Sequence, residues 1–298
     1  MAVGTSNFGE LLWPGIKATY GERYAMWSKL YPKVFEEMDS DKAFEKFQGL
    51  TGFGLAGVKD QGKPISYADP YLGFQTIIDP VVYALGSSVT LEMYEDDQYS
   101  FINKIPALLA DSMNVTEETI AFNVLNRAFN ASFTGADGLT LCNTAHPLVD
   151  GSSTYSNRPT VAADLDQTSL ENAFIAISQF VDDRNKPINL MGTLLVVSTS
   201  DQFIAEKILK TEYKLDSADN TINPMSGKVP HIVVPYLTDP DAWFLKTNVS
   251  EGFVFTWRRR PKPERENEFD TQNLKFVTTM RFGTGFVNPR CVYGSPGV

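Results

Sequence analysis

The apolar positions of residues 98–130 recur at helical spacing and predict one long helix. These positions are Phe101, Ile105, Leu108, Leu109, Met113, Ile120, Val124, Leu125 and Phe129. Pro106 is compatible with a helix if it lies in the first turn. Thr116, Glu117 and Glu118 would suit the start of a second helix, so the pattern leaves a break open there. An unbroken helix over this range would span about 50 Å.

Residues 45–97 show two patterns that are typical of a long, bent β-hairpin. Glycines are dense between Phe47 and Gly62, and glycine permits bends and close approach of backbones. Apolar and polar side chains then alternate, with Val81, Tyr83, Leu85, Val89, Leu91 and Met93 on one face. An isolated hairpin is marginally stable and has unpaired edges. We therefore expect it to dock on another surface; folding back onto its own domain is the alternative.

Residues 165–250 alternate between helical and strand patterns, which indicates an α/β unit. Thr168-Ser169-Leu170-Glu171 reads as a capping box before an amphipathic helix that extends to Val181. Residues 194–197 are all apolar, as in a central strand buried on both faces. A helix is expected from Asp201 to Lys210, and further strands at 232–234 and 243–245.

Residues 251–298 return to alternating strand patterns, at 253–258 and at 274–282. The charged stretch between them, Arg258 to Glu266, contains two prolines and is interpreted as a connector or an intersubunit ion-pair strip. Its candidate ion-pairing residues are Arg258, Arg259, Arg260, Glu264 and Arg265. Binding of phosphate is the alternative role for this charged stretch.

The fold class is therefore α+β, and the chain divides into five segments. They are an arm at 1–44, a hairpin at 45–97, a helix and long polar loop at 98–164, the α/β unit at 165–250, and returning strands at 251–298. The arm is rich in aromatic residues but poorly periodic, so we expect extended chain with one or two helical turns. Its candidate contact residues are Trp13, Tyr20, Tyr24 and Trp27, because exposed aromatics need a surface to lie on.

Charge and motifs exclude several functions. The formal net charge is -10, which disfavours a dedicated DNA-binding protein and association with anionic membranes. No secretory signal and no apolar run of membrane-spanning length is visible. The two histidines lack zinc-ligand spacing, and no phosphate-binding glycine loop occurs. We expect no metal, no cofactor and no catalytic site.

Cys142 and His146 suggest a catalytic alternative. Cys142 precedes His146 by four residues, and a thiol near an imidazole could form the reactive pair of a cysteine hydrolase. Both residues lie in a loop rich in glycine, serine and threonine, which would fix their geometry poorly. A structural role for this loop is therefore the preferred interpretation.

The order of the segments resembles the Hong Kong 97-type capsid fold of tailed bacteriophages. Several stretches are similar to the Mu-type major head subunit family: residues 88–97, 125–129, 141–148, 194–197 and 281–283. The resemblance implies an N-arm, an E-loop hairpin, a P-domain with a spine helix, and an A-domain. It implies a major capsid protein that assembles as hexamers and pentamers into an icosahedral shell around DNA, with no enzymatic activity.

The resemblance also implies which residues contact neighbouring copies of the chain and which other proteins take part in assembly. The E-loop of one subunit would lie across its neighbour, through Gly52, Phe53, Gly54, Gly57, Lys59, Gly62, Tyr67, Tyr71 and Phe74. Expected partners are other copies, a portal and a decoration protein. Because only some 44 residues precede the hairpin, a separate scaffolding protein is also expected; the alternative is that the numbering starts after maturation cleavage. Double-stranded DNA would be enclosed without sequence-specific binding, and assembly would take place in the host cytoplasm. An encapsulin-like bacterial compartment shell is the alternative that keeps the fold.

Overall fold

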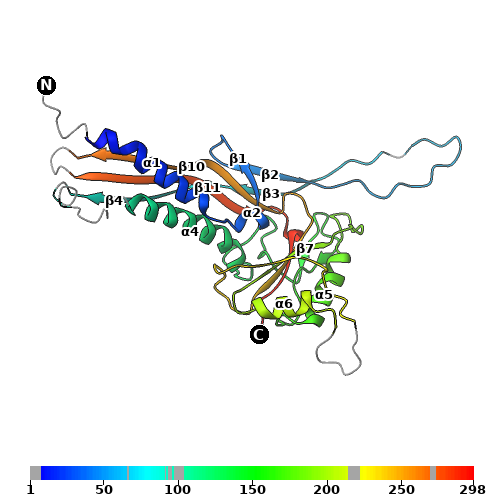
Figure 1. Ribbon diagram of the computed structural model, residues 1–298. Coiled ribbons are helices and arrows are strands. Elements are labelled where there is room, and N and C mark those ends of the chain that lie inside the picture. The colour runs from blue at the N-terminus through cyan, green and yellow to red at the C-terminus, as the bar shows by residue number, and fades with distance from the viewer. Residues whose placement is uncertain are drawn as a thin grey trace.

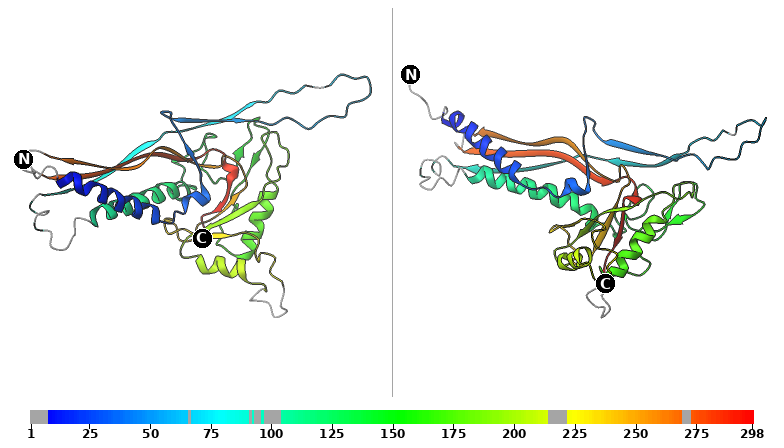
Figure 2. Two further views of the ribbon diagram at one scale, coloured as in Figure 1. Left: turned by 45° about the horizontal axis from the view of Figure 1, so that its top comes forward. Right: turned by 45° about the vertical axis from the view of Figure 1, so that its right-hand side comes forward.

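The computed structural model describes residues 8–65, 67–90, 92, 96, 104–213, 222–268 and 273–298. The chain is elongated, with a long sheet at one end and an α/β unit at the other. A hairpin leaves the body between them and projects well beyond it (Figure 1). The views in Figure 2 show that the hairpin stands clear of both parts over most of its length.

The long sheet is assembled from segments that are far apart in the sequence. Its strand order is β1-β10-β11-β4, for β1 (Glu36–Asp39), β10 (Phe253–Asn267), β11 (Leu274–Phe286) and β4 (Val81–Val89). β1 pairs with β10 in parallel, and the other pairs are antiparallel. Two helices, α1 (Phe8–Met26) and α4 (Ile105–Asn126), run side by side along one face of this sheet (Figure 1).

The long helix is confirmed, and it is unbroken over 22 residues in α4. At 1.5 Å per residue it spans about 33 Å, which is less than the sequence pattern suggested. Pro106 lies in its first turn, where the missing N–H costs nothing. The expected restart at Thr116 is wrong, because Glu117 and Glu118 are buried in the middle of the helix and bond the N-terminal segment.

The expected second hairpin strand belongs to the long sheet instead. β4 pairs with β11, and Tyr83 stacks on Phe282 with ring centroids 4.8 Å apart. The projecting hairpin is formed by β2 (Glu45–Leu50) and β3 (Leu72–Ile78). Alternation shows that a strand has one apolar face, but it does not show which strand it pairs with. Leu91 and Met93 lie outside the described residues.

The charged stretch 258–266 is a strand rather than a connector. β10 continues through it to Asn267 and pairs with β11. Its partner β1 ends opposite Trp257, so the remainder of β10 is an edge, where proline is tolerated. A register shift between Arg259 and Lys262 places Pro261 at an irregularity of the ladder, the usual place for proline in a sheet.

The N-terminal segment is more ordered than the sequence suggested. The 19-residue helix α1 is followed by the short helix α2 (Tyr31–Val34) and by β1, which joins the long sheet. Tyr20 and Tyr24 stand at positions i and i+4 of α1, a helical signal hidden by the polar residues around them, and Trp27 follows the end of this helix. The extended arm is therefore a wrong prediction over the described residues.

The α/β unit contains a second sheet with the order β12-β9-β7-β8. Its strands are β12 (Val292–Ser295), β9 (Trp243–Thr247), β7 (Gly192–Val197) and β8 (His231–Val233), and its helices are α5 (Gln167–Ser178) and α6 (Gln202–Lys210). The buried central strand at 194–197 is confirmed within β7. The capping box lies two residues earlier than expected, between Asp166 and Ser169.

The loop at 131–164 carries only short elements, β5 (His146–Pro147) and β6 (Thr154–Tyr155), as its composition predicted. One hydrophobic core joins the two ends of the molecule. Phe255, Trp257 and Phe282 from the long sheet share it with Leu125 of α4 and Phe244 of β9. A separate core lies between the second sheet and its helices. The hairpin contributes to neither core, so its outer part is not held by apolar packing.

Candidate assembly hairpin and its support

The hairpin exposes apolar side chains along most of its length. Leu55 is 86% exposed, Val58 97% and Tyr67 93%. Other large apolar residues on it are also exposed: Leu50, Phe53, Ile65, Tyr71, Leu72, Phe74 and Ile77. So many exposed apolar side chains on one projecting segment mark a contact with another molecule.

The tip of the hairpin ends in a defined turn. The amide of Lys63 donates to the carbonyl of Asp60 at 3.2 Å, and the Lys63 ammonium pairs with the Asp60 carboxylate at 2.6 Å. Gly62 has a φ of 81°, which favours glycine at this position. Lys59 and Gly57 are exposed beside the turn. The structure thus brings the expected residues Gly57, Lys59 and Gly62 together at the far end.

The inner part of the hairpin lies against the α/β unit. An added Cβ at Gly52 or Gly54 would meet only the ends of charged side chains, Lys186 and Asp182 or Arg184. The Arg184 guanidinium lies over the Tyr71 ring, 4.5 Å from its centroid. Sequence reasoning missed these contacts, because the turn that supplies them lies more than a hundred residues further along the chain.

The candidate arm residues contact their own subunit. Tyr20 is buried against Leu109 of α4 and Phe276 of β11. The Tyr24 hydroxyl donates to Glu117 at 2.5 Å, and Trp27 is half-buried. α1 includes Trp13, whose side chain lies outside the described part of the chain. No intersubunit role is needed to explain the burial of Tyr20 or the bond of Tyr24.

Two buried glutamates hold the N-terminal segment to α4. Glu117 binds the Lys29 ammonium at 2.5 Å, and Glu118 accepts the amides of Leu30 and Tyr31 at 2.6 and 3.1 Å. Glu118 thereby satisfies amides at the start of α2, as a capping residue would. Burial raises the pKa of both carboxyls above its ordinary value, against the opposing effect of their donors.

Attachment of the N-terminal segment should therefore strengthen at mildly acidic pH. A carboxyl whose pKa is raised in the folded state stabilises that state below the unfolded pKa and loses this contribution as pH rises through the folded pKa. Deuterium uptake of α1, corrected for intrinsic exchange, should fall between pH 7.5 and pH 5 in the native chain. The double variant Glu117→Gln, Glu118→Gln should lack this pH dependence; an identical pH dependence in the variant would contradict the assignment.

The candidate ion-pairing residues of β10 have partners within the chain. Arg258 lies 3.3 Å from Asp41, and Arg260 lies 3.2 Å from Asp39. Glu264 pairs with Lys262 at 3.4 Å. Arg259 is exposed, and Arg265 also has an interaction within the chain. These pairs connect β10 to β1 and its following turn, so an intersubunit role for Arg258 and Arg260 would require exchange of partners.

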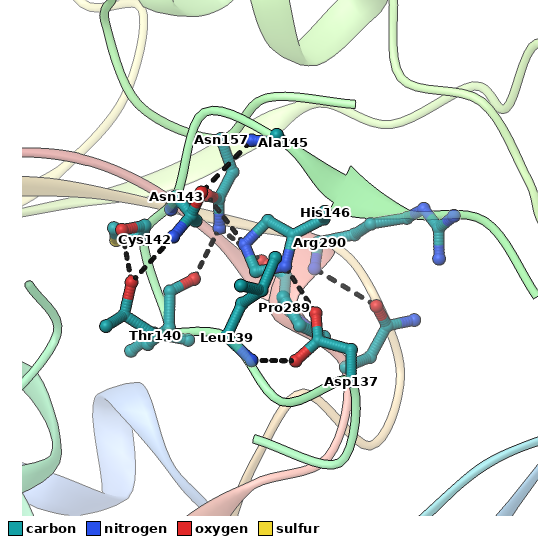
Figure 3. Close-up of polar contacts among 12 residues, drawn as sticks. Asp137, Leu139, Thr140, Cys142, Asn143, Ala145, His146, Asn157, Pro289 and Arg290 are labelled. Atoms are coloured by element: carbon teal, nitrogen blue, oxygen red, sulfur yellow. Dashed lines mark hydrogen bonds and ion pairs between the residues drawn. The ribbon is translucent and has the colours of Figure 1, made fainter. Parts of the chain in front are cut away.

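A buried polar network supports the region from which the hairpin leaves. Nδ1 of His146 lies 2.5 Å from Oδ2 of Asp137, and Nε2 lies 3.1 Å from Oδ1 of Asn157 (Figure 3). The Asn157 amide nitrogen donates to the carbonyls of Leu141 and Pro289 at 2.7 and 2.9 Å. Its Oδ1 accepts the Asn143 amide at 2.8 Å. Asn157 thus ties the long loop to the 3-10 helix η3 (Pro289–Cys291).

The cysteine hydrolase alternative does not fit this geometry. Cys142 is fully buried, and burial raises the pKa of its thiol, so the reactive thiolate is disfavoured. Both ring nitrogens of His146 face oxygens of Asp137 and Asn157 rather than the thiol. The loop is nevertheless well ordered by these bonds. The polar residues that sequence reasoning weighed as a reactive pair therefore serve as structure.

Among the residues described, no group of three or more histidine, cysteine or acidic side chains is arranged to hold a metal ion. None of the helices in the described ranges is long and apolar enough to cross a membrane.

Solved structures with the same architecture are capsids and related particles. The procapsid of bacteriophage JBD30 matches with a TM-score of 0.55 at 16% identity, covering 98% of this chain and 76% of that one. The capsid of a native GTA particle matches with a TM-score of 0.57 at 11% identity, covering 89% and 90%. A virus-like particle from Pyrococcus furiosus matches with a TM-score of 0.54 at 9% identity, covering 94% and 97%. At these identities the likeness shows the fold.

A projecting hairpin, a long helix beside a long sheet, and an α/β unit together define a shell subunit with the Hong Kong 97-type capsid fold. Residues 73–295 match the model of the Phage capsid protein family, which is most of the chain. The chain belongs to this family and is a major capsid protein, a structural component of the virion. The family match does not favour the encapsulin-like alternative. No curated protein sequence matches the chain.

Proposed function

We propose that the hairpin at residues 45–78 lies across a neighbouring copy of the chain and holds the shell together. The observation that carries this proposal is the exposure of its apolar side chains, Leu55, Val58 and Tyr67 above all. Burial of apolar surface contributes about 25 cal/mol per Å², so many repeated contacts of this kind favour a closed particle. Candidate contact residues are Gly52, Phe53, Gly54, Gly57, Lys59, Gly62, Tyr67, Tyr71 and Phe74.

The segments would then correspond to an N-arm, an E-loop reduced to β2 and β3, a P-domain built on α4 and the long sheet, and an A-domain around β7. Copies would form hexamers and pentamers on an icosahedral lattice. The segment order and the stretches at 88–97 and 141–148 support assignment to the Mu-type major head subunits.

A scaffolding protein, a portal and a decoration protein are the proposed partners, and assembly is proposed to occur in the host cytoplasm. The solved JBD30 capsid is described as decorated with minor capsid protein trimers, which supports a decoration partner here. The net charge of -10 suits a container that must not bind its own double-stranded DNA tightly.

Deletion of the hairpin tip tests the proposal. Replacing residues 53–69 by a short glycine linker removes the most exposed apolar side chains of the hairpin, Leu55, Val58 and Tyr67, but leaves the paired strands β2 and β3. We expect a folded subunit that forms no closed particles by negative-stain electron microscopy and sedimentation velocity. Normal particles from this deletion would contradict the proposed role of the hairpin.

A further inference from the structure

A cleft lined by polar and apolar residues separates the stem of the hairpin, which is its paired strands β2 and β3, from the body. The cleft has a volume of about 130 Å³. Gly49, Gly73 and Phe74 line it from the stem, and Asp137, Glu251 and Arg290 line it from the body. The stem is thus not packed against the body by apolar side chains at this point. Something else must set the direction in which the hairpin leaves.

At its base the hairpin is fixed by one apolar contact. Ile78, the last residue of β3, is buried and lies on Gly283 and Gly285 of β11. A Cβ at Gly283 would come within 2.8 Å of the Ile78 side chain, so this close approach requires a glycine. This contact lies at the base of the hairpin and does not reach the residues beyond β2 and β3.

The turn at residues 182–186, here named the stem clamp, holds the hairpin just beyond its paired strands. The Lys186 ammonium donates to the carbonyl of Phe53, which follows β2. The Arg184 guanidinium donates to the carbonyl of Asp69, which precedes β3, and covers the Tyr71 ring. Among the described residues, Arg184 and Lys186 are the side chains of the body that donate hydrogen bonds to this part of the hairpin.

The stem clamp is itself rigid. Asp182 accepts the amides of Arg184 and Lys186 at 2.9 and 2.8 Å, and its own amide donates to the Lys186 carbonyl at 2.7 Å. Asn185 adopts a φ of 56°, which asparagine tolerates better than most residues. Burial by itself would raise the pKa of Asp182, but the hydrogen bonds from Lys186 and Arg184 outweigh it and lower the pKa.

The stem clamp is also tied to the polar network of the long loop. Arg290 is buried; it donates to the Val181 carbonyl at 2.8 Å and binds Asp183 at 2.9 Å. Its guanidinium lies 4.2 Å from the centroid of the Tyr155 ring, which in turn stacks on His146. A continuous set of contacts, buried at Arg290 and His146 and exposed at Tyr71, therefore leads from the core of the molecule to the hairpin.

We propose that Arg184 and Lys186 are positioning residues that orient the hairpin in the free subunit for docking on the next copy. The inference rests on the proposed docking of the hairpin and adds how its direction is set. A hairpin held in its docked direction loses less conformational freedom when it binds, which favours association without any new intersubunit contact. The hydrogen bonds of the clamp use backbone carbonyls, whereas the contact of Arg184 with Tyr71 depends on that side chain.

The test compares the double variant Arg184→Ala, Lys186→Ala with the native chain and with Lys207→Ala, Lys210→Ala. The control removes the same charge from the exposed side of α6 in the same unit. Two readouts are required: deuterium uptake of residues 51–71 in the subunit, and the protein concentration at which particles appear. Lys186→Arg, which keeps a cationic donor, serves as the conservative variant.

We expect faster exchange of residues 51–71 and an assembly threshold raised about tenfold, equivalent to about 1.4 kcal/mol, in the double variant only. Lys186→Arg should retain most of the native threshold. An unchanged assembly threshold, with or without faster exchange, would contradict the proposed role of the clamp. It would not contradict the proposed docking of the hairpin. If the tip deletion of residues 53–69 also assembled normally, the proposed function itself would fail. Lys186→Ala alone provides the same comparison if the double variant does not fold.

Discussion

Substituting Leu55→Asp and Val58→Asp together is expected to abolish particle formation while leaving the subunit folded. Both side chains are almost fully exposed in the subunit, so the change costs its fold little. On a neighbouring copy, each buried aliphatic side chain would contribute about 1.5 to 3 kcal/mol. The aspartates would remove this contribution and add the cost of burying two charges. Sedimentation velocity and negative-stain microscopy measure the loss of particles, and circular dichroism verifies the fold.

The matched control is Val161→Asp with Met191→Asp. These residues are also large, apolar and exposed, but they lie outside the hairpin. The control should assemble as the native chain does if the hairpin surface is specifically responsible. Equal loss of particles in both variants would show that added charge alone prevents assembly. Normal particles from the hairpin variant would show that Leu55 and Val58 stay exposed in the shell.

The substitution Asn157→Ala is expected to destabilise the subunit by about 3 to 5 kcal/mol. Asn157 is fully buried, and its side chain bonds His146, the Asn143 amide and the carbonyls of Leu141 and Pro289. Alanine would leave these groups buried without partners. Thermal unfolding of the unassembled subunit should show a midpoint lowered by roughly 10 °C.

Asn130→Ala is the control for this substitution. Asn130 is exposed, and its side chain accepts only the nearby Ser132 amide at 3.0 Å. Its replacement should change the midpoint of unfolding by a small amount. A small effect of Asn157→Ala would mean that water or rearranged side chains satisfy the network, and the loop would then not be a rigid support for the stem clamp.

Elements with a strong local pattern could be predicted from the sequence. Residues 105–126 carry apolar residues at helical spacing over six turns, and residues 194–197 are apolar on both faces. Each signal lies within one short window, because a helix face or a doubly buried strand constrains neighbouring residues directly. The helix and the strand are present as predicted, although the helix begins at Ile105 and not at residue 98.

The pairing of strands far apart in the sequence could not be predicted in the same way. The alternation of Val81, Tyr83 and Leu85 is genuine, but β4 pairs with β11, almost two hundred residues away, and not with β3. The prolines of β10 suggested a connector because the sequence does not show that β1 covers only its first part. Strand partners depend on the whole topology, whereas alternation depends on one face of one strand.

The sequence predicted the hairpin as an assembly element, but it did not predict which residues hold the hairpin in place. Glycine density indicated the hairpin, and the turn at Gly62 forms where glycine was noted. The contacts that hold the hairpin come from Arg184 and Lys186, charged residues just after the helix that was expected to extend to Val181. His146 was noted beside Cys142, but its partners Asp137 and Asn157 are identified only once the loop is folded.

A cryo-electron microscopy map of assembled particles tests the central claim most directly. The subunit leaves the apolar side chains of residues 50–77 uncovered, so the map should show each hairpin lying on an adjacent copy, with Leu55 and Val58 in contact with it. A map in which the hairpin is folded against its own subunit, or extends freely into solvent, would contradict the account.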